Sequence, residues 1–183
     1  MSWIWIVAVF VVFIIFLWSK YNSFILLRNR YENGWAQINV ELKRRYDLIP
    51  NLVNSVKGYM THEKEVFENV AKARSQAMQA NTVAEHSKTE SQLTNTLKSL
   101  FAVMENYPEL KANENVMRLQ EELTSTENRI SFSRQFYNDI VMRYNQAIQL
   151  FPGNIIASMF NFGRQDYFEV DEAQVQDAPK VSL

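Results

Sequence analysis

The sequence contains no cysteine and only two histidines, four glycines and four prolines in 183 residues. Without cysteine the chain can form no disulfide, no thiolate metal site and no cysteine nucleophile. Few glycines and prolines, and no sustained apolar–polar alternation, argue against a sheet-rich or turn-rich fold. A Gly-rich phosphate loop and a nucleophile elbow are also missing, so nucleotide hydrolysis and acyl transfer have no support. The composition therefore predicts an all-α protein.

One long apolar run stands at the N-terminus, where every residue from Trp3 to Trp18 is apolar. As a helix this run extends about 24 Å, and the flanking residues from Met1 to Tyr21 bring it to the roughly 30 Å of a bilayer core. It lacks a basic n-region and an A-x-A cleavage site, so we expect residues 1–21 to be an uncleaved transmembrane anchor. Aromatic pairs at its two ends match interfacial belts, and Lys20 can extend to the headgroups. The pairs are Trp3 with Trp5, and Trp18 with Tyr21.

Charge is distributed unevenly around the anchor. No charged residue precedes it, whereas Lys20, Arg28 and Arg30 follow it closely. The positive-inside rule then places the N-terminus outside and the following domain in the cytoplasm. Residues 19–50 include six basic and three acidic side chains, a net charge of +3, which leaves −4 for the rest of the chain. A basic membrane-proximal region and an acidic tail favour a lipid bilayer as partner and argue against nucleic acid.

Helical periodicity continues directly from the anchor into an amphipathic stretch. Apolar residues three or four apart extend the first helix to about Lys57. Pro50 removes one helical hydrogen bond, but the apolar phase continues beyond it. A kink is therefore favoured over a break, although both remain open. Thr61 is expected to cap a second helix, whose first turn would include His62 and Glu63.

Two further helices are predicted from their capping residues. Thr82 and Glu85 have the capping-box spacing and start a third helix, which Pro108 ends. Asn113 can cap a long fourth helix, which ends at Pro152-Gly153.

The short connections between these helices predict their arrangement. We expect an N-terminal transmembrane helix that continues into a long antiparallel up-and-down bundle of about four helices over residues 22–170. A disordered acidic tail, 171–183, follows. In this topology the fourth helix returns toward the membrane and brings the apolar run 155–162 close to Lys20 and Arg28.

Several sequence motifs occur together along the chain, and their combination is specific to one protein family. They include RRYDLIPNLV, THE, AKAR, TENRI, FPGNIIASMFNF and the following DYFEV. In these segments the chain resembles the LemA family, from the anchor to about Val170. The resemblance implies a single-pass protein of the bacterial inner (cytoplasmic) membrane, with a helical-bundle domain and no established enzymatic activity. A related branch includes MamQ, which is linked to the membranes of magnetosomes, so membrane shaping or assembly is the implied theme.

Polar residues form two stripes, one on the first helix and one on the fourth. Those on the fourth are spaced by 7, 4 and 7 residues and therefore share one face. Buried charges persist only when they are paired, so the stripes predict a polar seam that fixes helix register. A contact between subunits and a ligand site are the functional alternatives. The stripe residues are Arg44, Arg45, Asp47, Asn51 and Asn54 on the first helix, and Glu127, Arg134, Asn138 and Asn145 on the fourth.

The apolar run after Gly153 has three possible roles. It can cap the end of the bundle, enter the membrane surface or bind a partner, because a bare apolar patch on a monomer is unusual. With the anchor and its basic flank, this run forms the predicted membrane-contact set. The set comprises Trp3, Trp5, Trp18, Lys20, Tyr21, Arg28, Ile155, Ile156, Met159, Phe160, Phe162 and Phe168.

His62 and Glu63 suggest a metal-dependent hydrolase as a remote alternative. A zincin motif would need a second histidine at position 66, where Val66 stands, so both residues are interpreted as serving the helix terminus. With two histidines and no cysteine in the chain, we expect no metal and no cofactor.

These observations favour a non-enzymatic, membrane-anchored helical scaffold. It would self-associate as a homo-oligomer and organise or remodel the cytoplasmic membrane. The alternative is a membrane-tethered adaptor that binds a cytoplasmic protein client through the second and third helices.

Overall fold

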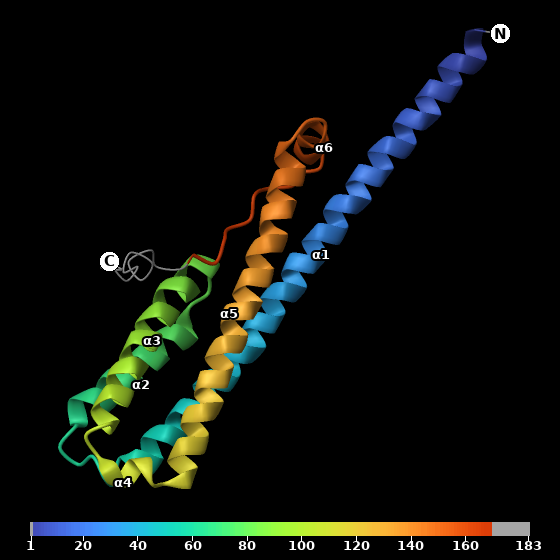
Figure 1. The fold of residues 1–183 in the computed structure, drawn as a ribbon. Helices are drawn as coiled ribbons and strands as arrows, with labels where there is room; N and C mark the ends of the chain where they lie inside the picture. Colours follow the sequence, from blue (N-terminus) through green and yellow to red (C-terminus); the bar gives the residue numbers. More distant parts are fainter. Residues whose placement is uncertain (1, 170–183) are drawn as a thin grey trace, which may run out of the picture. The chain divides into compact units, whose positions relative to one another are not determined.

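The computed structural model describes residues 2–169, and this part of the chain is helical throughout its regular structure, with no strand (Figure 1). The all-α prediction is confirmed. The predicted tail, 171–183, lies outside the described residues. Within the described part, six helices follow one another: α1 Ser2–Val56, α2 Lys64–Gln79, α3 Val83–Met104, α4 Pro108–Lys111, α5 Glu114–Gln149 and α6 Gly153–Met159.

Helix α1 is continuous over 55 residues, from the apolar run through the amphipathic stretch (Figure 1). Pro50 lies inside it and does not end it. Ile49 and Leu52, on either side of Pro50, are fully buried, so packing of the apolar face maintains the helix where one hydrogen bond is lost. The alternative of a break at Pro50 is therefore wrong. The helix ends at Val56, two residues before Gly58.

The predicted start of α2 at Thr61 is wrong, because the helix begins at Lys64. The chain forms turns between the two helices: the amide of Met60 donates to the carbonyl of Val56, at 3.2 Å, and the amide of Glu63 donates to the carbonyl of Met60, at 3.3 Å. Met60 is fully buried between these turns, whereas Thr61 is exposed. The residue before α2, Glu63, makes no side-chain cap hydrogen bond, and the chain is held here by these turns and by the buried Met60.

The other predicted caps are confirmed. Thr82 accepts a hydrogen bond from the amide of Glu85 at 3.1 Å, and Glu85 accepts one from the amide of Thr82 at 3.2 Å, which completes the capping box of α3. The side chain of Asn113 accepts from the amides of Asn115 and Val116 at the start of α5. The prediction that Pro108 ends the third helix is wrong, because α3 already ends at Met104. Pro108 instead occupies the first turn of α4, where its missing N–H costs nothing.

The chain divides into two compact units, and α1 and α5 each contribute a segment to both. Unit 1 comprises residues up to 37 together with 133–167, and unit 2 comprises 38–132 together with the residues from 168 onward. In unit 1 the two long helices are antiparallel, because Trp35 contacts Tyr137 and Tyr31 contacts Tyr144. The buried apolar side chains of unit 1 are Phe24, Tyr31, Tyr137, Ile140, Val141, Tyr144, Ile148, Ile156 and Ala157.

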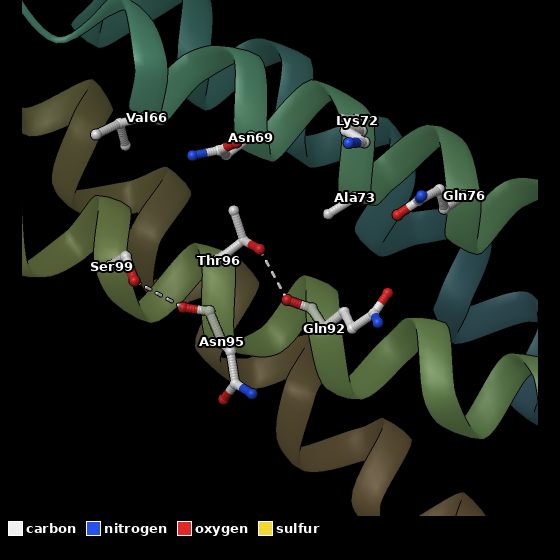
Figure 2. Close-up of a pocket in the computed structure, with 9 residues that line it drawn as sticks. All are labelled: Val66, Asn69, Lys72, Ala73, Gln76, Gln92, Asn95, Thr96 and Ser99. Atoms are coloured by element: carbon white, nitrogen blue, oxygen red, sulfur yellow. Dashed lines mark hydrogen bonds between the residues drawn. The ribbon is translucent and has the colours of Figure 1, made fainter.

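Unit 2 packs α2, α3 and α4 with segments of α1 and α5. Helices α2 and α3 are antiparallel, so that Val66 lies opposite Ser99 at one end and Gln76 lies near Gln92 at the other (Figure 2). Leucine, isoleucine and valine side chains dominate the interior. The fully or nearly fully buried ones include Ile38, Leu42, Ile49, Leu52, Val56, Val70, Leu93, Leu100, Leu110, Val116 and Ile130.

Candidate functional site

The first turns of α1 present a large uncovered apolar surface. In residues 2–169, α1 alone is long and apolar enough to cross a membrane, and its most apolar window has a mean hydropathy of 2.3 with none of it buried. Trp3 is 81% exposed and Trp18 is 68% exposed. Side chains this apolar are stable in contact with lipid and costly in contact with water.

Aromatic contacts join the end of this apolar surface to the segment that follows α6. The rings of Tyr21 and Phe160 meet edge to face with centroids 4.9 Å apart. Phe162 packs against Tyr21 at 5.7 Å and against Phe24 at 5.3 Å. Such edge-to-face pairs add stability beyond their buried area. They place α6 beside the point in unit 1 where α1 ceases to be uniformly apolar.

The α5–α6 turn and α6 expose several large apolar side chains, which we call the α6 surface. The exposed fractions range from 54% for Ile155 to 79% for Phe151. The sequence from 144 to 163 contains no charged residue. An uncharged segment with this much exposed apolar area is typical of an interaction surface. The α6 surface consists of Leu150, Phe151, Ile155, Met159 and Phe160.

Three of the predicted membrane-contact residues are not fully available on this surface. Ile156 is buried on the inner side of α6, and Phe162 is half-buried by its ring contacts. Phe168 is 1% exposed and belongs to unit 2. The assignment of Ile156 and Phe168 to the membrane-contact set is therefore wrong, because both side chains are enclosed in protein.

Gly153 allows α6 to start close to the end of α5. A Cβ atom at this position would lie 2.2 Å from the carbonyl oxygen of Ala147 and 3.2 Å from Cζ of Phe24. No side chain fits so close to a backbone oxygen. Glycine at this position therefore determines how α6, and the surface it presents, sits in unit 1.

Unit 1 holds the extended segment after α6 with side chains of α5. The Asn145 amide donates to the carbonyl of Gln165 at 2.9 Å, and its oxygen accepts from the amide of Gln165 at 3.0 Å. The hydroxyl of Tyr144 donates to the carbonyl of Gly163, and that of Tyr137 donates to the carbonyl of Asp166, both at 3.1 Å. Asn145 is buried, and these bonds satisfy polar groups that would otherwise be costly to bury.

Burial also changes the acidity of these tyrosines. Desolvation raises the pKa of Tyr137 to about 12, and the nearby Tyr31 and Asp166 add to the increase. The pKa of Tyr144 is raised as well, again chiefly by burial. Both hydroxyls therefore stay protonated at neutral pH and serve as hydrogen-bond donors.

A buried charge cluster lies in unit 2. Arg45 on α1 is within 3.0 Å of Glu90 on α3 and within 3.0 Å of Glu127 on α5. Its guanidinium also donates to the hydroxyl of Thr94 at 2.8 Å. The side chains of Arg45 and Glu90 are 3% and 0% exposed, while Glu127 is partly exposed. A single cation thus links three helices of unit 2 in a low-dielectric interior.

Tyr46 completes this cluster from the neighbouring position of α1. Its hydroxyl donates a short hydrogen bond to Glu90, and its backbone carbonyl accepts a 2.8 Å bond from Arg74 of α2. Burial of Glu90 is sustained because both of its carboxylate oxygens have partners. The cluster is a connected polar network, and no step of a reaction is evident from it.

The remaining residues of the predicted stripes are more exposed. Arg44 lies 4.0 Å from Glu122, and both are partly exposed. On α1, in unit 2, the side chains of Asp47, Asn51 and Asn54 point away from the interior. On α5, in unit 1, Arg134 and Asn138 are half-buried.

Glu90 and Tyr46 were not among the predicted site residues. Glu90 has one available signal: it precedes Leu93, Leu97 and Leu100 at the same three- and four-residue spacing, so a carboxylate occupies a core position. A glutamate at a core position of this helical repeat indicates a buried cationic partner. The identity of the partner cannot be derived from spacing, because it lies 45 residues away on another helix.

His62 and Glu63 do not form a metal site. His62 is exposed, and Glu63 accepts a hydrogen bond from the hydroxyl of Tyr107 at 3.1 Å. Among the described residues, no three His, Asp or Glu side chains lie close enough to share a metal ion. The pKa of the other histidine, His86, is lowered by burial, which favours its neutral form.

An open groove of about 510 Å³ lies between α2 and α3 in unit 2 (Figure 2). Side chains from both helices line it, and amide groups are the most frequent among them. None of its nine described lining residues is acidic, and Lys72 is the single charged one. The lining residues are Val66, Asn69, Lys72, Ala73, Gln76, Gln92, Asn95, Thr96 and Ser99.

Comparison with known proteins connects this architecture to a family. The model of the LemA family matches residues 34–183, most of the chain. The chain belongs to the LemA family. Members of this family and the MamQ proteins are not known as enzymes.

Two kinds of related protein, MamQ and LemA, are similar to this chain along most of their length. Magnetosome protein MamQ 2 of Paramagnetospirillum magneticum is 24% identical, with the alignment covering 94% of this chain and 72% of that protein. MamQ of Magnetospirillum gryphiswaldense is 23% identical over the same shares. Protein LemA of Metamycoplasma hominis is 25% identical over 90% of this chain and 76% of its own. Family membership, together with the uncovered apolar α1, indicates a membrane-associated LemA-family protein.

Proposed function

We propose that this protein is a single-pass membrane scaffold that contacts the bilayer twice. The first contact is the apolar segment of α1, and the second is the α6 surface. The observation that supports this is the 4.9 Å contact between Tyr21 and Phe160, which holds the α6 surface beside the end of the apolar segment. A helix that leaves the bilayer at Tyr21 therefore brings the α6 surface to the same leaflet.

The charge of the two units supports contact with an anionic leaflet. The described residues of unit 1 include six basic and three acidic side chains, a net charge of +3. Those of unit 2 include twelve basic and fourteen acidic side chains, a net charge of −2. Basic residues beside a membrane each contribute about 1 kcal/mol of attraction to anionic lipids. The cytoplasmic side of a bacterial inner membrane is the location we propose, with the N-terminus outside.

Self-association would require a surface that the fold leaves free. Asp47, Asn51 and Asn54 follow one another at four- and three-residue spacing on α1 and are exposed. They therefore present one polar face of unit 2 to solvent. Arg45, by contrast, is engaged within its own chain. We propose that the exposed face, and not the buried part of the stripe, forms the contact between subunits.

The membrane contact is tested with full-length protein in vesicles that contain about 30% anionic phospholipid. This fraction gives the vesicle surface a strong negative potential. Electron microscopy should show deformed or tubulated vesicles. A Phe151→Ser, Phe160→Ser double variant should leave the vesicles smooth, whereas Met117→Ser, which removes an exposed apolar side chain from unit 2, should not. Smooth vesicles with the unchanged protein would refute membrane remodelling.

The subunit contact is tested separately by crosslinking in the same vesicles. Replacing Asn51 and Asn54 by lysine introduces like charges at the proposed contact, so crosslinked multimers should disappear. Arg118→Lys, at an exposed site in the same unit, serves as the control. Multimers that persist in the double variant would exclude this face as the contact.

A second candidate function, an adaptor for a cytoplasmic protein, is favoured by the α2–α3 groove. Its volume lies within the range of ligand sites in proteins, and its amide groups can donate and accept hydrogen bonds. Crosslinking from a photoreactive amino acid at Gln76 in cells would identify such a client. A failure to capture one discrete protein would argue against this function.

A further inference from the structure

A smaller pocket of unit 2, with a volume of about 140 Å³, lies between α3 and α5 beside the buried charge cluster. Its apolar lining consists of Leu97, Phe101 and Leu123, and the two leucines are almost fully buried. A mostly apolar pocket with a few polar groups is typical of a small-molecule site. The pocket is open to solvent, because three of its other lining residues are exposed: Lys98, Thr124 and Asn128.

The volume of the pocket limits what it can hold. An apolar cavity of about 150 Å³ engineered in another protein holds a single benzene molecule, whereas drug-sized ligands occupy sites of about 300 Å³ or more. The half-buried Phe101 adds an aromatic side chain to the lining, and paired aromatic rings gain stability beyond their buried area. The pocket therefore suits one aromatic ring.

The charge cluster forms the polar side of this pocket, because Arg45, Thr94 and Glu127 all line it. Oε2 of Glu127 lies 3.0 Å from Arg45, whereas Oε1 accepts a long hydrogen bond of 3.4 Å from the hydroxyl of Thr94. A carboxylate oxygen can accept two hydrogen bonds, and the Glu127 side chain is 37% exposed. Arg45 thus holds a carboxylate at the pocket while one of its oxygens can still accept a hydrogen bond from a ligand.

The charges at the pocket balance. Of its lining residues, Arg45 and Lys98 are positive and Glu127 is negative. Glu90, the other carboxylate partner of Arg45, supplies the second negative charge. An anionic ligand would be repelled by Glu127, and a cationic one by Arg45 and Lys98. We propose that this pocket binds a small neutral phenol, whose ring packs against the apolar lining and whose hydroxyl donates to Oε1 of Glu127. A phenol has a pKa of about 10 and therefore keeps this proton at neutral pH.

The location of the site is tested with 4-fluorophenol and the full-length protein in detergent micelles. The fluorine NMR line of the probe broadens on binding, and the part of the broadening that excess phenol removes measures saturable binding beyond uptake by the micelle. Thr124→Trp and, independently, Asn128→Trp place a large ring at the pocket and should abolish this part. Ser125→Trp is the control, because Ser125 is exposed and adjacent but does not line the pocket. Thermal unfolding followed by circular dichroism establishes that each variant is folded.

The hydrogen bond is tested by competition with toluene, which has nearly the shape of phenol and carries a methyl group in place of the hydroxyl. At equal free concentration toluene should displace the probe about tenfold less effectively, the effect expected for one hydrogen bond to a carboxylate. In Glu127→Met, which leaves Arg45 its contact with Glu90, this difference should disappear. Glu122→Met should preserve it, because Glu122 is a partly exposed carboxylate of α5 that does not line the pocket.

Each outcome decides the proposal. Saturable binding that is present in the unchanged protein and in Ser125→Trp, and absent from the two pocket variants, supports it. No displaceable broadening in the unchanged protein would overturn it, and so would displacement that survives in folded Thr124→Trp or Asn128→Trp, which would place the binding elsewhere. Toluene that competes as well as phenol would overturn the hydrogen bond to Glu127. Benzoate that competes better than phenol would identify an anion site and overturn the choice of a neutral ligand.

Discussion

The two units of this chain are held together by different buried polar contacts. In unit 1 the neutral side chains of Tyr137, Tyr144 and Asn145 satisfy the backbone of the segment after α6. Unit 2 buries a charged network in which Arg45 is shared between Glu90 and Glu127. Unit 1 also exposes the α6 surface and carries the net positive charge.

The two kinds of contact differ in what the loss of one partner costs. A neutral donor or acceptor left buried without its partner costs about 1–3 kcal/mol. In unit 2 a buried ion pair fixes the register of three helices at a high cost for any broken partner. Variants that remove one of these buried contacts from each unit therefore test the comparison.

The largest effect is expected from Arg45→Met, which removes the cation and leaves Glu90 buried without it. Breaking a buried pair in this way costs about 3–5 kcal/mol. The midpoint of thermal unfolding of the full-length protein in detergent, followed by circular dichroism, should fall sharply. Its control is Arg44→Met, because the contact of Arg44 with Glu122 is long and partly exposed and is worth less than about 1 kcal/mol. Equal losses for the two variants would show that the cluster does not stabilise unit 2.

A smaller and local effect is expected from Gly153→Ala in unit 1. The added methyl group would lie 2.2 Å from the carbonyl of Ala147, so the start of α6 must move. Such overpacking costs about 1–3 kcal/mol. Hydrogen exchange should accelerate over α6 and not over α3. Gly58→Ala has nothing within 4 Å of the new methyl group and is the matched control. Unchanged exchange over α6 in the Gly153 variant would contradict this explanation.

A similar but weaker loss is expected from Asn145→Leu. The variant keeps the volume of the side chain but leaves the amide and carbonyl of Gln165 without their partners, at a cost of about 1–2 kcal/mol. Hydrogen exchange at residues 163–167 should accelerate. Gln146→Leu, at the next and exposed position of α5, is the control. If the two variants exchange alike, Asn145 does not hold the segment.

Local structure could be predicted from the sequence where it depends on neighbouring residues. The capping box of Thr82 and Glu85 is confirmed because both partners lie within one turn. The prediction that α2 begins after a cap at Thr61 was wrong. The start of the helix at Lys64 depends on the packing of the buried Met60, which is a tertiary effect. Phe168 shows the same limit, since its apolar character does not reveal which apolar surroundings enclose it.

The same limit applies to the residues of the candidate site, because their partners lie far away in the sequence. Periodicity identifies the face of a helix on which Arg45 lies but not the helix that faces it. Glu90 is brought to Arg45 by the folding of α3 against α1, and no spacing in the sequence encodes that distance. The aromatic contact of Tyr21 with Phe160 agrees with the predicted return of the chain to the anchor, because that prediction required only the topology of the helices.

The smallest effect concerns pH and the buried tyrosine hydroxyls of unit 1. Burial raises the pKa of Tyr137 from 10.0 to about 12, so the folded state holds this proton more tightly than the unfolded state. The stabilising contribution is complete below about pH 10 and is lost as the pH rises toward 12. Hydrogen exchange within unit 1 should therefore accelerate, relative to its intrinsic rate, between these values. In Tyr137→Phe this dependence should become shallower, with the remaining part due to Tyr144, whose pKa is also raised. Ultraviolet titration of the tyrosinate absorbance provides the second measurement, because the variant should lose one group that titrates near pH 12. A variant that retained the full dependence would show that Tyr137 is ionised as easily as a tyrosine in water, and that its hydroxyl does not hold the backbone of Asp166.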